Sequence, residues 1–213
     1  MLLVVQLLGV VLYPLMENTA TGRALFGAFG IVMLSLALWV VNRSPSVNWI
    51  AWLLAVPSLA CSLLGTVSHE GALVTFAQMM ECLLYFYTAA SLTAYMLEDH
   101  RVTSDELFAA GATFTLLAWA FAFAFSVCQQ WYPGSFSAGS DATAPRTWME
   151  LLYLSFSVLS AVGLSDIVPV RSPARALVML EQFAGVMYIA LVVSRLIGLT
   201  ILRAQRPEAR PKE

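Results

Sequence analysis

Charged residues are scarce in this sequence. Only 11% of its 213 residues are charged and 60% are apolar, whereas about 25% of residues are charged in ordinary soluble domains. Six of the 24 charges fall in residues 203–213, so the preceding 202 positions carry only 18. This composition excludes both a water-soluble globular domain and a disordered chain. Because the formal net charge is −2 and no basic cluster lies outside the tail, it also excludes a nucleic-acid-binding protein.

Cysteine and histidine are too few and too scattered to predict a metal site. The three cysteines, Cys61, Cys82 and Cys128, are widely spaced, and the two histidines, His69 and His100, lie in different loops. Metal sites need clustered ligands. We therefore interpret the cysteines as small hydrophobic packing residues and expect no cofactor.

Long apolar runs dominate the chain instead. A helical crossing takes about 20 apolar residues, so the length accommodates five or six spans with short loops. Polar residues, proline or glycine separate the runs, as is typical of helix ends. The sequence predicts an all-α membrane protein with six transmembrane helices. The runs cover residues 2–16, 24–41, 48–67, 72–97, 107–128 and 175–202, and a shorter run lies near 147–160.

The first apolar run and the charges in the loops predict how the chain crosses the membrane. A signal peptide is the alternative for residues 2–16, but the run has no basic region before it and no clear Ala-x-Ala motif after it. We therefore predict a first helix that is retained, and whether it spans fully is open. Six spans put both termini on the same side of the membrane. That side carries six basic residues, and the opposite side carries four. This asymmetry predicts cytoplasmic termini for a multi-pass protein of the cell (inner) membrane.

The segment between the last two spans is too short to cross the bilayer. Residues 147–160 lead into a stretch with glycine and serine that cannot remain helical through Pro169. Non-helical backbone at membrane depth occurs only where protein or a water-filled path surrounds it. A short helix, an irregular segment, an acidic residue and a further span form the layout of a carbonyl-lined ion filter. We predict a re-entrant pore helix followed by a filter loop.

The residues of this region resemble a known family. Residues 160–169 align with the pattern Thr-Thr-Val-Gly-Tyr-Gly-Asp-Ile-x-Pro, which Val162, Gly163, Asp166, Ile167 and Pro169 match. The chain therefore resembles the tetrameric potassium-channel superfamily, in particular small bacterial six-span members of its two-helix ion-channel family. The resemblance extends over residues 130–202 and is less specific over residues 1–129.

This resemblance implies a site with three parts. Asp166 would contribute a ring of carboxylates at the outer mouth, the alternative being a loop carboxylate bound to its neighbours. Gly185 follows Ser165 by 20 residues, at the place of the superfamily's gating glycine, and serves either as a hinge or for close helix packing. The filter, whose backbone carbonyls replace part of a cation's water shell, would be formed by Ser160, Ala161, Val162, Gly163, Leu164 and Ser165.

Three filter positions depart from the family pattern. Ala161 replaces a threonine whose hydroxyl forms the innermost ion site, and Leu164 replaces a tyrosine whose hydroxyl braces the filter. Ser165 replaces a glycine. If the family backbone is kept, a positive φ at that serine costs about 1–2 kcal/mol per chain. Potassium selectivity is therefore not implied, and a non-selective or non-conducting homologue is the alternative.

Ionisable residues inside the spans are functional candidates by default. Glu81 replaces the arginines that a voltage sensor needs on the fourth span, so we interpret it as a partner of a polar group between helices rather than a proton sensor. Glu150 is interpreted as a carboxylate that favours the start of the pore helix. Arg195 is expected to snorkel at the cytoplasmic end, and Glu181 is a further candidate.

These observations combine into one prediction. Residues 1–104 would form a four-helix peripheral bundle without sensor arginines, residues 105–202 a pore domain, and residues 203–213 a basic cytoplasmic tail. Because one chain supplies one re-entrant loop, a homotetramer in the lipid bilayer would surround the path of permeant cations, with potassium favoured and sodium the alternative. Two functions of other classes are the alternatives to a channel. A secondary transporter would need a second interrupted segment, and an intramembrane enzyme would need a nucleophile and a membrane histidine. Neither feature is evident in the sequence.

Overall fold

The structure, a computed structural model, describes residues 2–16, 30–39, 48–68, 71–98, 104–139 and 144–204. Most of these residues are helical. Two short strands, β1 (Phe136–Ala138) and β2 (Ile167–Pro169), form the only sheet in the described ranges. The helices are α1 (Leu2–Met16), a further stretch at Gly30–Trp39, α3 (Asn48–Ser68), α4 (Gly71–Glu98), α5 (Ser104–Trp131), α6 (Trp148–Leu159) and α7 (Ser172–Ala204).

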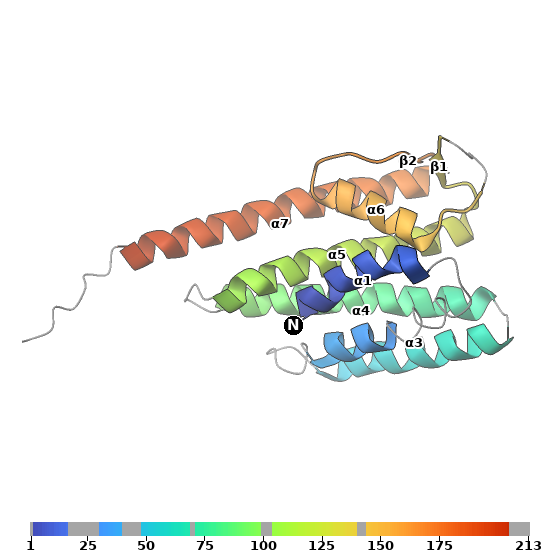
Figure 1. The fold of residues 1–213 in the computed structure, drawn as a ribbon, viewed down its shortest axis with the longest axis horizontal. Helices are drawn as coiled ribbons and strands as arrows, with labels where there is room; N and C mark the ends of the chain where they lie inside the picture. Colours follow the sequence, from blue (N-terminus) through green and yellow to red (C-terminus); the bar gives the residue numbers. More distant parts are fainter. Residues whose placement is uncertain are drawn as a thin grey trace, which may run out of the picture.

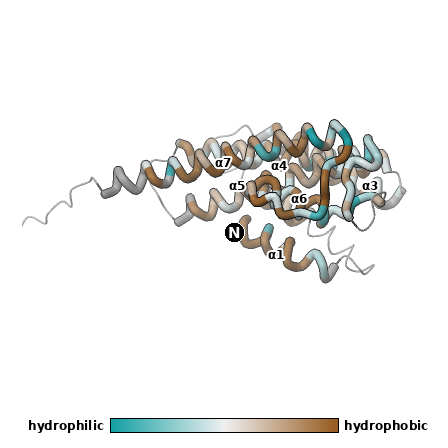
Figure 2. The backbone as a smooth tube through the Cα atoms, turned by 90° about the horizontal axis from the view of Figure 1, so that it is seen from above, coloured by the Kyte–Doolittle hydropathy of each residue, from teal (hydrophilic) through white to brown (hydrophobic). Residues whose placement is uncertain are grey.

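Three described helices are long and apolar enough to cross a membrane. They are Gly71–Leu97 within α4, Leu107–Trp131 within α5 and Ser172–Arg195 within α7, and Figure 2 shows apolar residues along their length. The described apolar parts of the earlier helices are shorter than a crossing of about 20 residues. Six spans therefore remain a prediction.

Several predictions fall on residues outside the described ranges. The predicted span at 24–41 is described only over Gly30–Trp39, and the tail only as far as residue 204. His69 and His100 also lie outside the described residues, as do the three loop arginines Arg23, Arg43 and Arg101, on which the predicted orientation depends together with the tail.

The helices pack in layers with α5 at the centre. α3 packs against α4, α4 packs against α5, and α5 contacts α1, α6 and α7, so that α7 and α3 lie on opposite sides of the molecule (Figure 1). The alternation of alanine and phenylalanine over residues 120–125 would suit a strand, yet these residues are helical. A helix satisfies its own backbone hydrogen bonds, which lipid cannot do.

The loop between α5 and α6 is buried in part, although its Pro-Gly-Ser sequence at residues 133–135 and its small residues are typical of an exposed turret. α5 continues to Trp131 rather than ending at residue 128, and Ser135, Phe136 and Ala138 are buried. The ring of Phe136 lies 5.2 Å from that of Phe125. Residues 132–134 are exposed, as local composition indicates, but packing against α5 buries the residues that follow.

Strands β1 and β2 join this loop to the segment after the predicted filter. They are antiparallel, with Phe136 opposite Pro169 and Ala138 opposite Ile167. The N–H of Val170 donates to the carbonyl of Ser135 at 2.8 Å. The chain that leaves residues 160–166 is thereby anchored to the end of α5.

Candidate functional site

The start of α6 carries a complete capping box. Thr147 is the N-cap, and its side-chain oxygen accepts from the N–H of Glu150 at 3.3 Å. Glu150 Oε2 accepts in return from the N–H of Thr147 at 2.6 Å. These bonds satisfy two donors that a helix otherwise leaves unpaired. The interpretation of Glu150 as a carboxylate that stabilises this helix start is confirmed.

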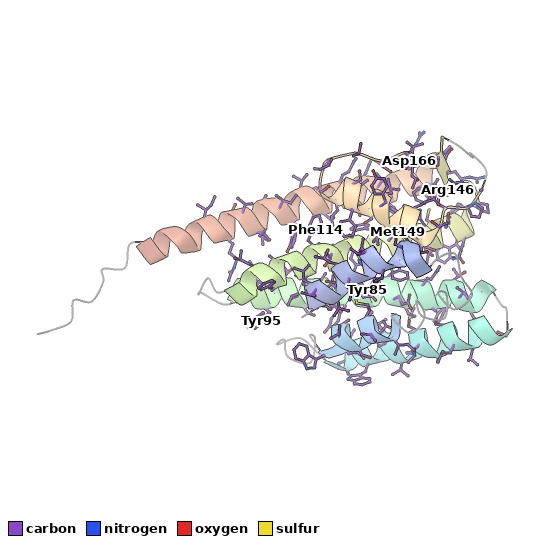
Figure 3. The ribbon with its side chains drawn as sticks, in the orientation of Figure 1. Tyr85, Tyr95, Phe114, Arg146, Met149 and Asp166 are labelled. Carbon is purple, nitrogen blue, oxygen red and sulfur yellow. The ribbon has the colours of Figure 1, made fainter. Side chains whose placement is uncertain are left out.

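Arg146 ties the same helix start to α5. Its backbone N–H donates to Gln129 Oε1 at 3.0 Å, and its carbonyl accepts from Gln129 Nε2 at 2.9 Å. Its guanidinium lies 3.4 Å from Glu150 Oε1 and donates to the carbonyl of Ala144. Figure 3 places Arg146 and Asp166 toward the end of the molecule where the two strands pair.

α6 ends at Leu159 in a tight turn. The N–H of Ala161 donates to the carbonyl of Val158 at 3.0 Å, and that of Gly163 donates to Ser157 at 3.0 Å. Both Ala161 (φ 60°) and Gly163 (φ 70°) adopt left-handed conformations. Two left-handed residues two positions apart exclude a helix and a strand, so the chain is irregular until β2 begins.

Most of the predicted filter residues lie on the surface of the single chain. Ala161, Val162, Gly163 and Leu164 are exposed, and the side chains of Val162 and Leu164 are each 70% exposed. Ser160 and Ser165 are half-buried, and Asp166 is exposed. The backbone of this segment thus faces away from the rest of its own chain.

The expected strain lies at a different residue from the one that the sequence indicates. The family pattern suggests a positive φ at Ser165, but within the described ranges Ala161 is the non-glycine residue with a positive φ. Ser165 instead accepts from the N–H of Ile167 through its Oγ at 3.1 Å. Such local side-chain bonds favour turns, and a glycine cannot make this one.

Gly185 lies where α6 ends against α7. It is buried, and a Cβ at this position would overlap the carbonyl group of Leu159 and lie 2.9 Å from its Cα. Thirteen helical residues separate Gly185 from Ser172, which corresponds to about 20 Å along α7. The close contact supports the packing role predicted for this glycine, and the end of α6 therefore meets the middle of α7.

Glu181 occupies the same face of α7, one turn earlier, and is fully buried. Its Oε1 is hydrogen-bonded to Ser155 Oγ, which is also 2.8 Å from the carbonyl of Ala118. A serine hydroxyl has one proton. If Ser155 donates to Ala118, Glu181 must be protonated and donate to Ser155. This cluster joins α5, α6 and α7 one helical turn before the contact of Gly185 with Leu159.

Sequence reasoning found only part of this arrangement. It singled out Glu181 as an intramembrane carboxyl, but its partner Ser155 is 26 residues away and no local signal links the two. The capping box was available from the Thr-x-x-Glu spacing of Thr147 and Glu150. The contact of Gly185 with Leu159 depends on the packing of two helices.

The comparisons with known proteins agree with this geometry. Residues 111–201, from within α5 to near the end of α7, match a family model described as an ion channel, Ion_trans_2. No curated protein and no solved structure matches the chain. The match confirms the resemblance to the two-helix ion-channel family over these residues and supports a pore-forming role in a multi-pass membrane protein. It also favours a channel over an enzyme.

Proposed function

We propose that this protein is the pore-forming subunit of a potassium-channel-like cation channel of the cell membrane. Four copies surround a central path, and cations pass down their electrochemical gradient without covalent chemistry. The backbone carbonyls of residues 160–164 line the narrow part of the path. The carboxylates of Asp166 concentrate cations at its outer mouth.

One observation supports this function above all: residues 161–164 are irregular and exposed beside the middle of α7. If α7 spans the bilayer, these residues lie at a depth where lipid cannot satisfy their backbone groups. A water-filled path bounded by other copies of the same segment satisfies them. A single re-entrant loop cannot enclose an ion, so several chains are required.

The direction of α6 favours cations over anions. Its C-terminal end at Leu159 adjoins the irregular segment, and helix C-termini carry a partial negative charge. Four such ends directed toward a shared axis would lower the energy of a cation there. The capping box and Arg146 hold the opposite end of α6 against α5.

A non-selective or non-conducting homologue is the second candidate. Ala161 has no hydroxyl to offer an ion, and the Leu164 side chain is largely exposed and cannot make the hydrogen bond of a tyrosine. Ser165 does not adopt the positive φ that would suit a glycine. These departures favour a filter that holds ions with fewer ligands.

Flux measurements test both candidates. Purified protein in liposomes is expected to pass potassium, and Asp166→Asn is expected to slow cation flux by reducing the charge at the mouth. The comparison variant carries Ala161→Thr, Leu164→Tyr and Ser165→Gly together. If only this triple variant conducts, or only it discriminates potassium from sodium, the second candidate is correct. If neither protein passes cations, conduction is excluded.

A further inference from the structure

A cavity of about 210 Å³ lies within the helical bundle, and none of residues 160–166 lines it. It is bounded by the Gly30–Trp39 helix, α3, α4, α5 and the first residue of α6. Figure 3 places Tyr85, one of its lining residues, inside the bundle and away from Asp166. The side chains that define its chemistry are Gln78, Glu81, Tyr85, Trp119, Phe123 and Trp148.

Aromatic rings from three helices form one wall of this cavity. The ring centroids of Trp119 and Trp148 are 4.9 Å apart, and those of Tyr85 and Phe123 are 5.6 Å apart. Phe123 lies 5.8 Å from Trp148, and Tyr85 lies 6.1 Å from Trp119. These distances show that the rings pack against one another as a continuous wall, and an aromatic face attracts a cation that lies within about 6 Å of its own centroid.

Glu81 supplies the only carboxyl group among the described lining residues, and none of them carries a positive charge. Its Oε1 accepts from Ser58 Oγ at 3.3 Å, a neutral partner on α3. An ionised carboxylate among apolar helices is costly unless a cation balances it, and without a cation the group takes up a proton. The cavity therefore suits a ligand with one positive charge.

The remaining polar groups limit what kind of cation fits. Gln78 Oε1 already accepts from Ser126 at 3.1 Å and from Gln130 Nε2 at 2.6 Å, which uses both of its lone pairs. Besides Gln78, the described lining residues offer four side-chain oxygens, two on Glu81 and one each on Ser62 and Tyr85, which are fewer than the six to eight oxygen ligands of a calcium ion. A fully methylated ammonium needs no acceptor.

We propose that this cavity binds a small quaternary ammonium ion. The carboxylate of Glu81 balances its charge, and its methyl groups lie against the wall formed by Tyr85, Trp119, Phe123 and Trp148. The volume equals that of about seven water molecules at about 30 Å³ each, which limits the ligand to the size of choline. Because Trp148 begins α6, a bound ion touches the helix that leads to residues 160–166.

Polar side chains lie between this cavity and the Gly71 end of α4. A second hollow of about 580 Å³ is lined by Gly71, Thr75, Gln130 and Trp131. Gln130 is hydrogen-bonded to both Thr75 and Gln78, and Gln78 lines the inner cavity. The hydrogen-bonded side chains of Gln130 and Gln78 therefore lie between the two hollows.

Choline binding to the full chain tests the proposal without measuring conduction. The protein is placed in phosphatidylglycerol nanodiscs, and choline is titrated while heat and tryptophan fluorescence are recorded. Saturable binding is expected, and Glu81→Gln is expected to weaken it at least tenfold. The matched control is Glu181→Gln, a buried carboxyl outside the cavity, which should leave the affinity within twofold. The neutral isostere 3,3-dimethylbutan-1-ol should bind at least tenfold more weakly than choline.

A second variant, Gly30→Leu, tests the site independently in case Glu81→Gln fails to fold. Gly30 lines the cavity, and a Cβ at this position meets nothing within 4 Å. Gly30→Leu is therefore expected to fill the space, abolish choline binding and preserve the helical circular dichroism. In phosphatidylcholine discs, weaker apparent choline binding would identify a lipid headgroup as a source of the same ligand, and unchanged binding would identify free molecules.

Three results would overturn the site. The first is no saturable binding to the wild-type chain. The second is equal affinity in wild type, Glu81→Gln and Gly30→Leu. The third is binding that Asp166→Asn abolishes and Glu81→Gln does not, because choline would then bind at the proposed mouth. A channel that fails to conduct but binds choline through Glu81 would reject the proposed function and keep this site.

Discussion

Ala161 and Ser165 differ in backbone conformation, and this difference can be measured. Ala161 has φ 60°, which costs a residue with a Cβ about 1–2 kcal/mol. We predict that Ala161→Gly raises the thermal unfolding midpoint in detergent, because glycine adopts this conformation freely. Ser165→Gly should lower the midpoint, since it removes the bond from Ile167 N–H to Ser165 Oγ and gains nothing at a φ that is not positive. Shifts of the same sign in both variants would contradict the assignment.

A second prediction at this scale concerns Gly185. The Cβ of Gly185→Ala would overlap the Leu159 carbonyl, so the two helices must move apart. Overpacking of this kind costs about 1–3 kcal/mol, and a lower unfolding midpoint is expected. Gly198→Ala on the same helix is the control, because a Cβ there meets nothing within 4 Å. It should be neutral or stabilising, since alanine favours helices by about 1 kcal/mol. A tolerated Gly185→Ala would argue against the close contact.

At the scale of helices, Ser155 connects α6 to both of its neighbours. Its Oγ reaches the carbonyl of Ala118 on α5 and the carboxyl of Glu181 on α7. Ser155→Ala leaves that buried carboxyl without this partner, and an unsatisfied buried group costs about 1–3 kcal/mol. We predict a lower unfolding midpoint in detergent.

The control for this variant is Ser157→Ala, two residues along α6. Ser157 is also buried, but its Oγ has no hydrogen-bond partner among the described residues. Its loss should change the midpoint much less. If Ser155→Ala and Ser157→Ala lower the midpoint equally, the hydrogen bonds of Ser155 do not hold α6 in place. The lower stability would then come from lost side-chain packing.

At the scale of the whole molecule, the exposed surface predicts assembly. The large side chains of α7 that lie at the surface include Met179, Phe183 and Met187. Lipid can cover such side chains, but it cannot satisfy the exposed backbone of residues 161–164. We predict that native mass spectrometry of the full chain in detergent shows four copies, and that Asp166→Asn leaves this number unchanged. A stable, folded monomer as the main species would contradict a shared pore.

The elements themselves were largely predictable from local sequence. Helices follow from long apolar runs that few charges interrupt, because lipid accepts a backbone only when it bonds to itself. The half-length of α6 and its start at Thr147 follow from apolar length and from the Thr-x-x-Glu spacing. Composition suits an exposed turret at residues 129–146, and residues 132–134 are exposed, but composition does not show that Phe136 packs against Phe125.

The sequence by itself thus determined the class of protein, the helical segments and the irregular segment after α6, because hydropathy, proline and glycine act over a few neighbouring residues. Only the tertiary structure decided which residue carries the left-handed strain, which serine meets Glu181, that Gly185 meets the end of α6, and that Glu81 shares a cavity with four aromatic rings. Each of these depends on contacts between segments far apart in the chain. Helix packing and not local preference sets those contacts.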